Sequence, residues 1–187
     1  MSKIAVLMVG MISFASMAFC QEEKAKPDAY TFVAISTGGS TGGASASFDF
    51  QIKRYTTDEE VQQLQDILKS QGQDGLRRAM EKMDVGRISR VGTTGTQISV
   101  ARKRQDGNNT IITIVTPRNM SFAELYNSGR STSYPFGYLQ VTLNEKGEGT
   151  GKIMAATKIT FNKKKNTVEL ESFGNQYIKA ANVRPNK

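Results

Sequence analysis

The stretch Thr57-Asp58-Glu59-Glu60-Val61-Gln62-Gln63-Leu64-Gln65-Asp66-Ile67-Leu68 is the clearest helical signal in the chain. Thr57 and Glu60 have the spacing of a capping box, in which each side chain accepts a hydrogen bond from the backbone amide of the other residue. The acidic residues of the first turn also interact favourably with the positive end of the helix dipole. The apolar residues recur at the spacing of one helix face: Val61, Leu64, Ile67 and Leu68. This pattern predicts an amphipathic helix that begins at Thr57.

A second helical segment follows this one. Gly72 is placed to end the first helix, because glycine adopts positive φ angles without a steric penalty. From Asp74 onward, one face of the second segment is again apolar: Leu76, Ala79, Met80 and Met83. Residues 57–83 therefore predict an αα-hairpin. Helices shorter than about 12–15 residues are marginal alone, so the pair is expected either to pack on a sheet or to form a lid over a cavity.

The rest of the chain predicts strands joined by short turns. The clearest alternation places Ala44, Ala46, Phe48, Phe50 and Ile52 on one face of a strand, and such alternation is typical of an antiparallel sheet with one solvated face. Further strand segments are expected at 30–36, 86–91, 97–103, 110–116, 136–143, 151–161, 167–172 and 177–183. In segment 151–161, the residues Ile153, Ala155, Ile159 and Phe161 are expected to share a face. A capping box at Ser121 and Glu124 also predicts a short helix to Asn127.

The predicted fold class is α+β, mostly β. We expect a strongly curved antiparallel sheet or partial barrel of about nine strands, because a sheet of that width curls or closes. The αα-hairpin is inserted between the second and third strands, and we expect it against the concave side of the sheet or across one mouth. Residues 30–187 are expected to form a single β-rich domain with the helical insert at 57–83.

The start of the chain has the pattern of a signal peptide at residues 1–20. Lys3 provides a positive charge, residues 4–15 form an apolar segment, and small residues follow. Cleavage is expected after Ala18 or after Cys20, with the second site preferred, and residues 21–29 are expected to be a flexible leader. Lipidation of Cys20 is not expected, because Phe19 stands where that signal requires a small residue. The sequence thus predicts a periplasmic or secreted protein without a transmembrane span after signal removal.

The chemistry of the side chains disfavours an enzyme. The chain has 187 residues, no histidine and a single cysteine, Cys20, which lies in the predicted signal. This composition excludes Ser-His-Asp triads and the commonest zinc sites, and we expect no catalytic residue, metal or cofactor. The glycine-rich loop 37–43 lacks the lysine of a P-loop. A hydrolase that works through Asp49 and Glu124 stays a third hypothesis.

The formal net charge of the chain is +8. The basic clusters are Arg102-Lys103-Arg104 and Lys163-Lys164-Lys165, both expected at hairpin ends. The preferred interpretation is that lysines at such places keep the protein soluble and protect sheet edges from pairing with other chains. The functional alternative is contact with an anionic surface or polymer of the cell envelope. Nucleic acid is not expected as a partner, because no aromatic-rich basic strand or recognition helix is present.

These observations favour a non-enzymatic binding or structural protein of the cell envelope. Its sharper form places an apolar small molecule or lipid in the concavity of the sheet, with Phe48, Phe50, Ile52 and Phe161 as the candidate lining. Residues of these types are more often ordinary core than ligand lining. The alternative is a protein-interaction or inhibitor module that acts through the loops 37–43 and 128–135.

The segments 52–60, 134–136, 147–152 and 157–159 resemble those of an uncharacterised group of signal-peptide-bearing bacterial proteins. The resemblance covers residues 30–184. It implies an exported bacterial domain, and it implies no activity, cofactor or catalytic residue.

Overall fold

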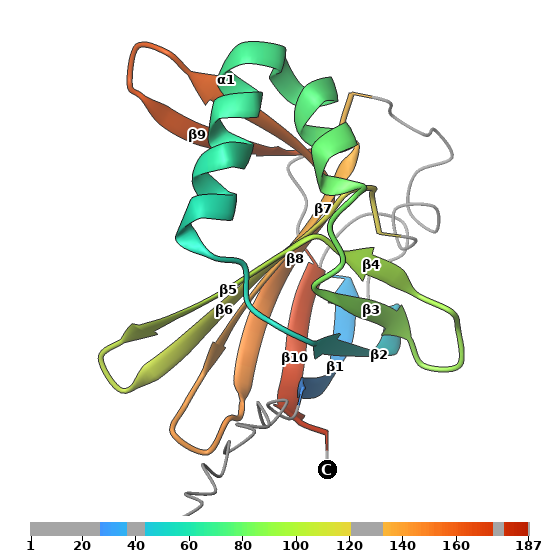
Figure 1. Ribbon diagram of the computed structural model, residues 1–187. Coiled ribbons are helices and arrows are strands. Elements are labelled where there is room, and N and C mark those ends of the chain that lie inside the picture. Colours follow the sequence, from blue (N-terminus) through green and yellow to red (C-terminus); the bar gives the residue numbers. More distant parts are fainter. Residues whose placement is uncertain (1–26, 37–43, 121–132, 174–177, 187) are drawn as a thin grey trace, which may run out of the picture.

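The computed structural model describes residues 27–36, 44–120, 133–173 and 178–186 (Figure 1). The predicted signal peptide, the loop 37–43, the short helix expected at 121–127 and residues 128–132 of the second loop lie outside the described residues. The elements, in chain order, are β1 (Asp28–Ser36), β2 (Ser45–Ile52), α1 (Asp58–Met80), β3 (Gly86–Arg90), β4 (Thr96–Ile98), β5 (Val100–Asp106), β6 (Asn109–Thr116), β7 (Phe136–Leu143), β8 (Gly149–Asn162), β9 (Thr167–Ser172) and β10 (Ile178–Pro185).

The strands form a nearly closed antiparallel barrel. Nine of them follow one another in the order β4-β3-β2-β1-β10-β8-β7-β6-β5, and β9 pairs with β8 outside this path. The two ends of the path, β4 and β5, are consecutive in the chain and are separated only by Ser99. The Ser99 amide donates to the Val115 carbonyl on β6 at 3.0 Å. The mostly-β prediction of a strongly curved antiparallel sheet is therefore confirmed.

Aromatic and branched side chains fill the interior of the barrel. The rings of Tyr30 and Phe50 stack with centroids 5.1 Å apart, and those of Phe32 and Phe48 with centroids 5.6 Å apart. On β1, for example, Tyr30, Phe32 and Ala34 alternate with less buried residues and belong to this interior, as expected for a pleated sheet. The fully buried side chains of this interior include Ile52, Ile98, Ile112, Ile114, Leu139, Leu143 and Ile153.

The expected αα-hairpin is wrong: one helical element, α1, runs from Asp58 to Met80 between β2 and β3. Its capping box is present, since the Glu60 amide donates to Thr57 Oγ1 at 3.2 Å and the Thr57 amide donates to Glu60 Oε2 at 2.9 Å. Gly72, with φ 68° and ψ −162°, interrupts the helical conformation inside the element. One glycine absorbs the change of direction visible in Figure 1, so no separate connecting loop is needed.

Helix α1 packs on the outer face of the barrel, and not on its concave side or across a mouth as expected. On β6, Ile114 points into the barrel core, whereas its neighbour Val115 packs against the cluster formed with the helix. On β5, Ala101 likewise belongs to the barrel core, and its neighbour Val100 packs against the helix cluster. The buried members of the helix cluster are Leu64, Leu68, Leu76, Met80, Phe136 and Ile159.

Strand β8 continues beyond the barrel and pairs with β9 to form a two-stranded extension, the β8–β9 ribbon, beside α1 (Figure 1). A register shift between Phe136 and Tyr138 on β7 adds one residue to the opposite segment of β8. Such a bulge moves the following side chains to the other face of the sheet. Ile153 therefore lies in the barrel core while Ile159 lies under α1, and the prediction that these two residues share a face is wrong.

Candidate functional site

An apolar groove lies between α1 and the β8–β9 ribbon. Its volume is about 240 Å³. Gln65 is the one lining residue with a polar side chain, and the full lining is Val61, Leu64, Gln65, Leu68, Leu76, Met80, Val100, Val115, Ile159 and Val168. We refer to this space as the outer groove.

The ribbon contributes an apolar wall that is left partly uncovered. Ile159 pairs across the strands with Leu170, and Phe161 pairs with Val168, so these side chains share one face. Val168 is 40% exposed and Leu170 is 43% exposed. Single exposed hydrophobic residues are ordinary, but adjacent ones at the rim of an apolar recess indicate a surface that can bind an apolar group.

The wall is held in place by Gln73 of α1. Its Nε2 donates to the Ser133 carbonyl at 3.2 Å, and its Oε1 accepts from the Ile159 amide at 3.2 Å. The Ile159 amide lies beyond the pairing of β8 with β7, which extends only to Thr157. The glutamine side chain thus satisfies a backbone donor that the sheet leaves free and fixes the helix to the ribbon.

Lysines gather at the hairpin end of the outer groove. The Lys69 ammonium lies 5.0 Å from the centre of the Phe161 ring, a cation–π arrangement. The turn between β8 and β9 carries Lys163, Lys164 and Lys165, as expected for this basic cluster. Within the described parts of the chain, neither Lys163 nor Lys164 has a carboxylate within ion-pair distance, whereas Lys165 lies 3.7 Å from Glu169.

The first basic cluster lies within β5 and not at a hairpin end. Arg102 donates to the Thr56 carbonyl at 2.6 Å and to Asp58 Oδ1 at 2.5 Å. These contacts attach the start of α1 to the barrel. Arg104 lies 4.0 Å from Asp106 on the same strand.

Lys103 belongs to a second linkage on the same strand. Lys103 and the hydroxyl of Tyr55 both donate to Asp28 Oδ2, at 3.2 Å and 2.6 Å. Burial raises the pKa of Tyr55, and the hydrogen bond to Asp28 raises it further. The Arg102–Arg104 cluster thus ties β1, α1 and β5 together, and its charges are largely balanced by carboxylates.

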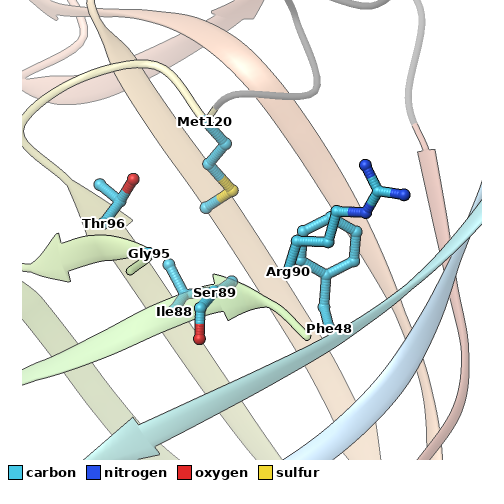
Figure 2. Close-up of a pocket in the computed structure, with 7 residues that line it drawn as sticks. All are labelled: Phe48, Ile88, Ser89, Arg90, Gly95, Thr96 and Met120. Atoms are coloured by element: carbon cyan, nitrogen blue, oxygen red, sulfur yellow. The ribbon is translucent and has the colours of Figure 1, made fainter. Parts of the chain in front are cut away.

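The candidate lining residues divide between two places. Phe48, Phe50 and Ile52 lie in the barrel core with at most 3% of their surface exposed, while Phe161 packs with the residues beside the outer groove. Figure 2 shows a small space at one end of the barrel, bounded by Phe48, Ile88 and Met120 among others. Its volume is about 10 Å³, which is the room needed by one water molecule.

The two carboxylates of the hydrolase hypothesis are Asp49 and Glu124. Asp49 accepts a hydrogen bond from Ser89 Oγ at 2.9 Å, and Glu124 lies outside the described residues. Across the described ranges, no group of three or more His, Cys, Asp or Glu side chains is arranged to hold a metal ion. No helix in those ranges is long and apolar enough to cross a membrane.

The outer groove was not predicted from the sequence, because it depends on elements far apart in the chain. The available signal was the alternation of Val168 and Leu170 with Glu169 and Glu171, directly after a lysine-rich turn. That alternation shows that one face of β9 is apolar, although it does not show which element faces it.

Comparisons with known protein families, with curated proteins and with solved structures find no match for this chain. The resemblance to exported bacterial proteins therefore stays a prediction.

Proposed function

We propose that this chain is a non-enzymatic exported binding protein of the cell envelope that holds the apolar part of a small molecule or lipid in the outer groove. The observation that carries this proposal is the apolar recess between α1 and the β8–β9 ribbon. Val168, which lines the recess, and Leu170, on the same face of the ribbon, are both partly exposed. Burying such exposed apolar surface is favourable by about 25 cal/mol per Å².

The proposed binding site is the outer groove, whereas the sequence led us to expect a ligand inside the curved sheet. The barrel interior is occupied by its own side chains, including Phe32, Phe50 and Ile112, each at most 1% exposed. The outer groove, at about 240 Å³, lies just below the range of roughly 300–1,000 Å³ that encloses drug-sized ligands. It therefore suits one apolar chain or ring, while the rest of the ligand stays in solvent.

The proposed role is binding, because the residues needed for the commonest nucleophilic and histidine-based mechanisms are missing from the sequence. There is no histidine to act as a base near neutral pH, and the single cysteine lies in the predicted signal. The carboxylate of Glu60 is engaged by Arg54 and by the backbone of the helix start. Binding needs none of these groups to react.

The test uses a neutral naphthylamine dye whose fluorescence rises in apolar surroundings. We expect saturable binding to the purified protein, and we expect Val168→Asp to weaken it about tenfold, because a carboxylate placed at the wall must lose hydration when the dye binds. Val91→Asp is the matched control, since Val91 is 60% exposed at the turn between β3 and β4. Equal affinity in both variants, or no binding to the wild type, would overturn the proposal.

If the dye does not bind, the alternative hypothesis is favoured, in which the protein is an interaction or inhibitor module that acts through loops 37–43 and 128–135. That hypothesis predicts a partner retained from envelope extract whose capture depends on those loops.

A further inference from the structure

We propose that the outer groove selects anionic single-chain amphiphiles, with the chain between α1 and the β8–β9 ribbon and the anionic head at the lysines of the hairpin end. This inference rests on the proposed function, and it adds the chemical class of the ligand and the orientation in which it binds.

The groove has distinct ends. Near the start of α1, Val61 lines the groove together with Val100 and Val115 of the barrel wall. About two helical turns further along, Leu68 lines it, and the adjacent Lys69 reaches the Phe161 ring on β8. The groove is therefore apolar where it meets the barrel and cationic where it meets the hairpin turn.

The turn lysines directly follow the groove wall. Phe161 pairs with Val168, and the next pair, Asn162 with Thr167, closes the hairpin. The Asn162 side chain accepts from the amides of Lys164 and Lys165 at 3.0 Å and 3.2 Å, which orders the turn. The backbone that carries these lysines is thus defined before any ligand is present.

The charges at this end are available to a ligand. The nearest carboxylate to Lys69 is that of Asp66, at 3.7 Å, and the Asp66 side chain is 62% exposed. An exposed ion pair of this kind contributes little free energy, so it holds the Lys69 ammonium only weakly. By contrast, Arg102 on β5 makes close contacts with a carbonyl and a carboxylate, and it has no comparable freedom. The groove lysines are therefore the better candidates for an anionic head.

The arrangement favours a dispersed amphiphile over a bilayer surface. A membrane-bound element needs a protruding apolar face bordered by basic residues. Here the apolar side chains line a recess, and the opposite face of the ribbon carries Glu169 and Glu171, which an anionic bilayer would repel. One chain can enter the recess while its head stays at the lysines.

The experiment compares three probes with the same ten-carbon chain at concentrations where each is monomeric: decanoate, decanol and decyltrimethylammonium. Titration calorimetry on the purified protein should rank decanoate first, about tenfold tighter than decanol, with the cation weakest. The preference for decanoate should decrease as salt is added, because exposed charges are screened.

Two variants distinguish the contribution of the ligand's anionic head group to affinity from that of its alkyl chain. The combined substitution Lys69→Gln, Lys163→Gln and Lys164→Gln should reduce decanoate affinity to that of decanol and leave decanol unchanged. Val168→Asp should weaken both probes. Lys146→Gln, in the exposed turn between β7 and β8, is the charge-matched control and should change neither.

Each outcome decides between the two proposals. Equal affinity of the wild type for decanoate and decanol would overturn the head-group inference and leave the apolar groove intact. Binding of neither probe would overturn both. A third outcome is that the protein does not bind decanoate but sediments with phosphatidylglycerol vesicles, and that Val168→Asp does not change this sedimentation. That result would overturn the proposal of a dispersed amphiphile in favour of binding to a lipid surface.

Discussion

Glu60 joins the start of α1 to the segment that precedes it. Its carboxylate accepts from Arg54 Nη1 and Nη2, each at 2.8 Å, and from the Thr57 amide at 2.9 Å. The hydrogen bonds from Arg54 are the main cause that lowers the pKa of Glu60 to about 2, and the bond from Thr57 adds to it. A depressed carboxylate pKa means that the folded state stabilises the charged form.

The first prediction concerns the substitution Glu60→Gln. The unfolded carboxyl titrates near 4.5, so this stabilisation is fully present above that pH and is lost as the pH falls toward about 2. We expect Glu60→Gln to lower the free energy of unfolding by about 1 kcal/mol at pH 7, and the deficit to shrink between pH 5 and pH 3. Urea unfolding across this range measures it. Glu148→Gln, at an exposed turn residue, is the control, and a deficit that does not change with pH would contradict the assignment.

Local residue patterns were readable from the sequence, and long-range partners were not. The capping box of Thr57 and Glu60 is confirmed because both partners lie within one helical turn. The contact of Arg102 with Asp58 spans 44 residues of chain, and it depends on a barrel closure that no local pattern reveals. The same limit explains why the basic residues of β5 were interpreted as a free cluster.

At the scale of the element, Gly72 sets the shape of α1. Its φ of 68° and ψ of −162° lie in a region that only glycine occupies at low cost. A Cβ atom built on Gly72 would meet nothing within 4 Å, so the constraint is conformational and not one of space. The bend it provides lets both halves of α1 bury apolar residues on the barrel, Leu64 and Leu68 before it and Leu76 and Met80 after it.

The second prediction follows from this backbone conformation. Gly72→Ala should destabilise the protein by about 1–3 kcal/mol. Gly72→Asn should cost a similar amount, because asparagine tolerates the left-handed helical region but not this one. Gln71→Ala, at the neighbouring exposed position, should change stability by less than about 0.5 kcal/mol. Midpoints of urea unfolding give the comparison, and an asparagine variant as stable as the wild type would contradict the conformational argument.

The type and position of most strands were predicted correctly, whereas the continuity of α1 and the bulge in β8 were not. Alternation located β2 and the ribbon strands, and the glycine was correctly expected to interrupt the helix. The single-element character of α1 and the bulge in β8 were missed, since each depends on one backbone residue whose conformation is set by tertiary packing. The bulge matters for the proposed binding site because it turns Ile159 and Phe161 toward the helix and so builds the groove wall.

At the scale of the whole molecule, the barrel and α1 are tied together at both ends of the helix. Before the helix, Thr56 exchanges hydrogen bonds with Ala101: its amide donates at 2.8 Å, and its Oγ1 accepts at 3.0 Å. After the helix, Ser99 Oγ donates to the Met80 carbonyl at 2.6 Å. Ser99 is also the residue where the chain passes from β4 to β5 and so from one end of the strand path to the other.

Hairpin signals in the sequence were sufficient to predict an antiparallel sheet, but they could not show that it nearly closes. Closure depends on one continuous segment, Thr96–Asp106, pairing first with β3 and then with β6. From the sequence, residues 97–103 were expected to form one strand with ordinary hairpin partners. Only the three-dimensional arrangement shows that this segment has neighbours on two different sides.

The third prediction tests this junction through Ser99→Ala. The side chain of Ser99 is fully buried, so Ser99→Ala deletes a buried hydrogen bond to the Met80 carbonyl, which keeps the Met83 amide as a donor at 3.0 Å. The expected cost is that of one net hydrogen bond, about 0.5–1.5 kcal/mol, and melting temperatures of chains of this size fall by about 2–4 °C per kcal/mol. Ser47→Ala, at an exposed position on β2, is the control and should leave the melting temperature unchanged.

Helical circular dichroism and tyrosine fluorescence should report one shared transition in the wild type and in Ser99→Ala, because the helix is attached to the strand that joins the two ends of the barrel path. A helical transition that separates from the tyrosine transition would show instead that α1 melts independently, and the outer groove would then form only after the barrel had folded without it.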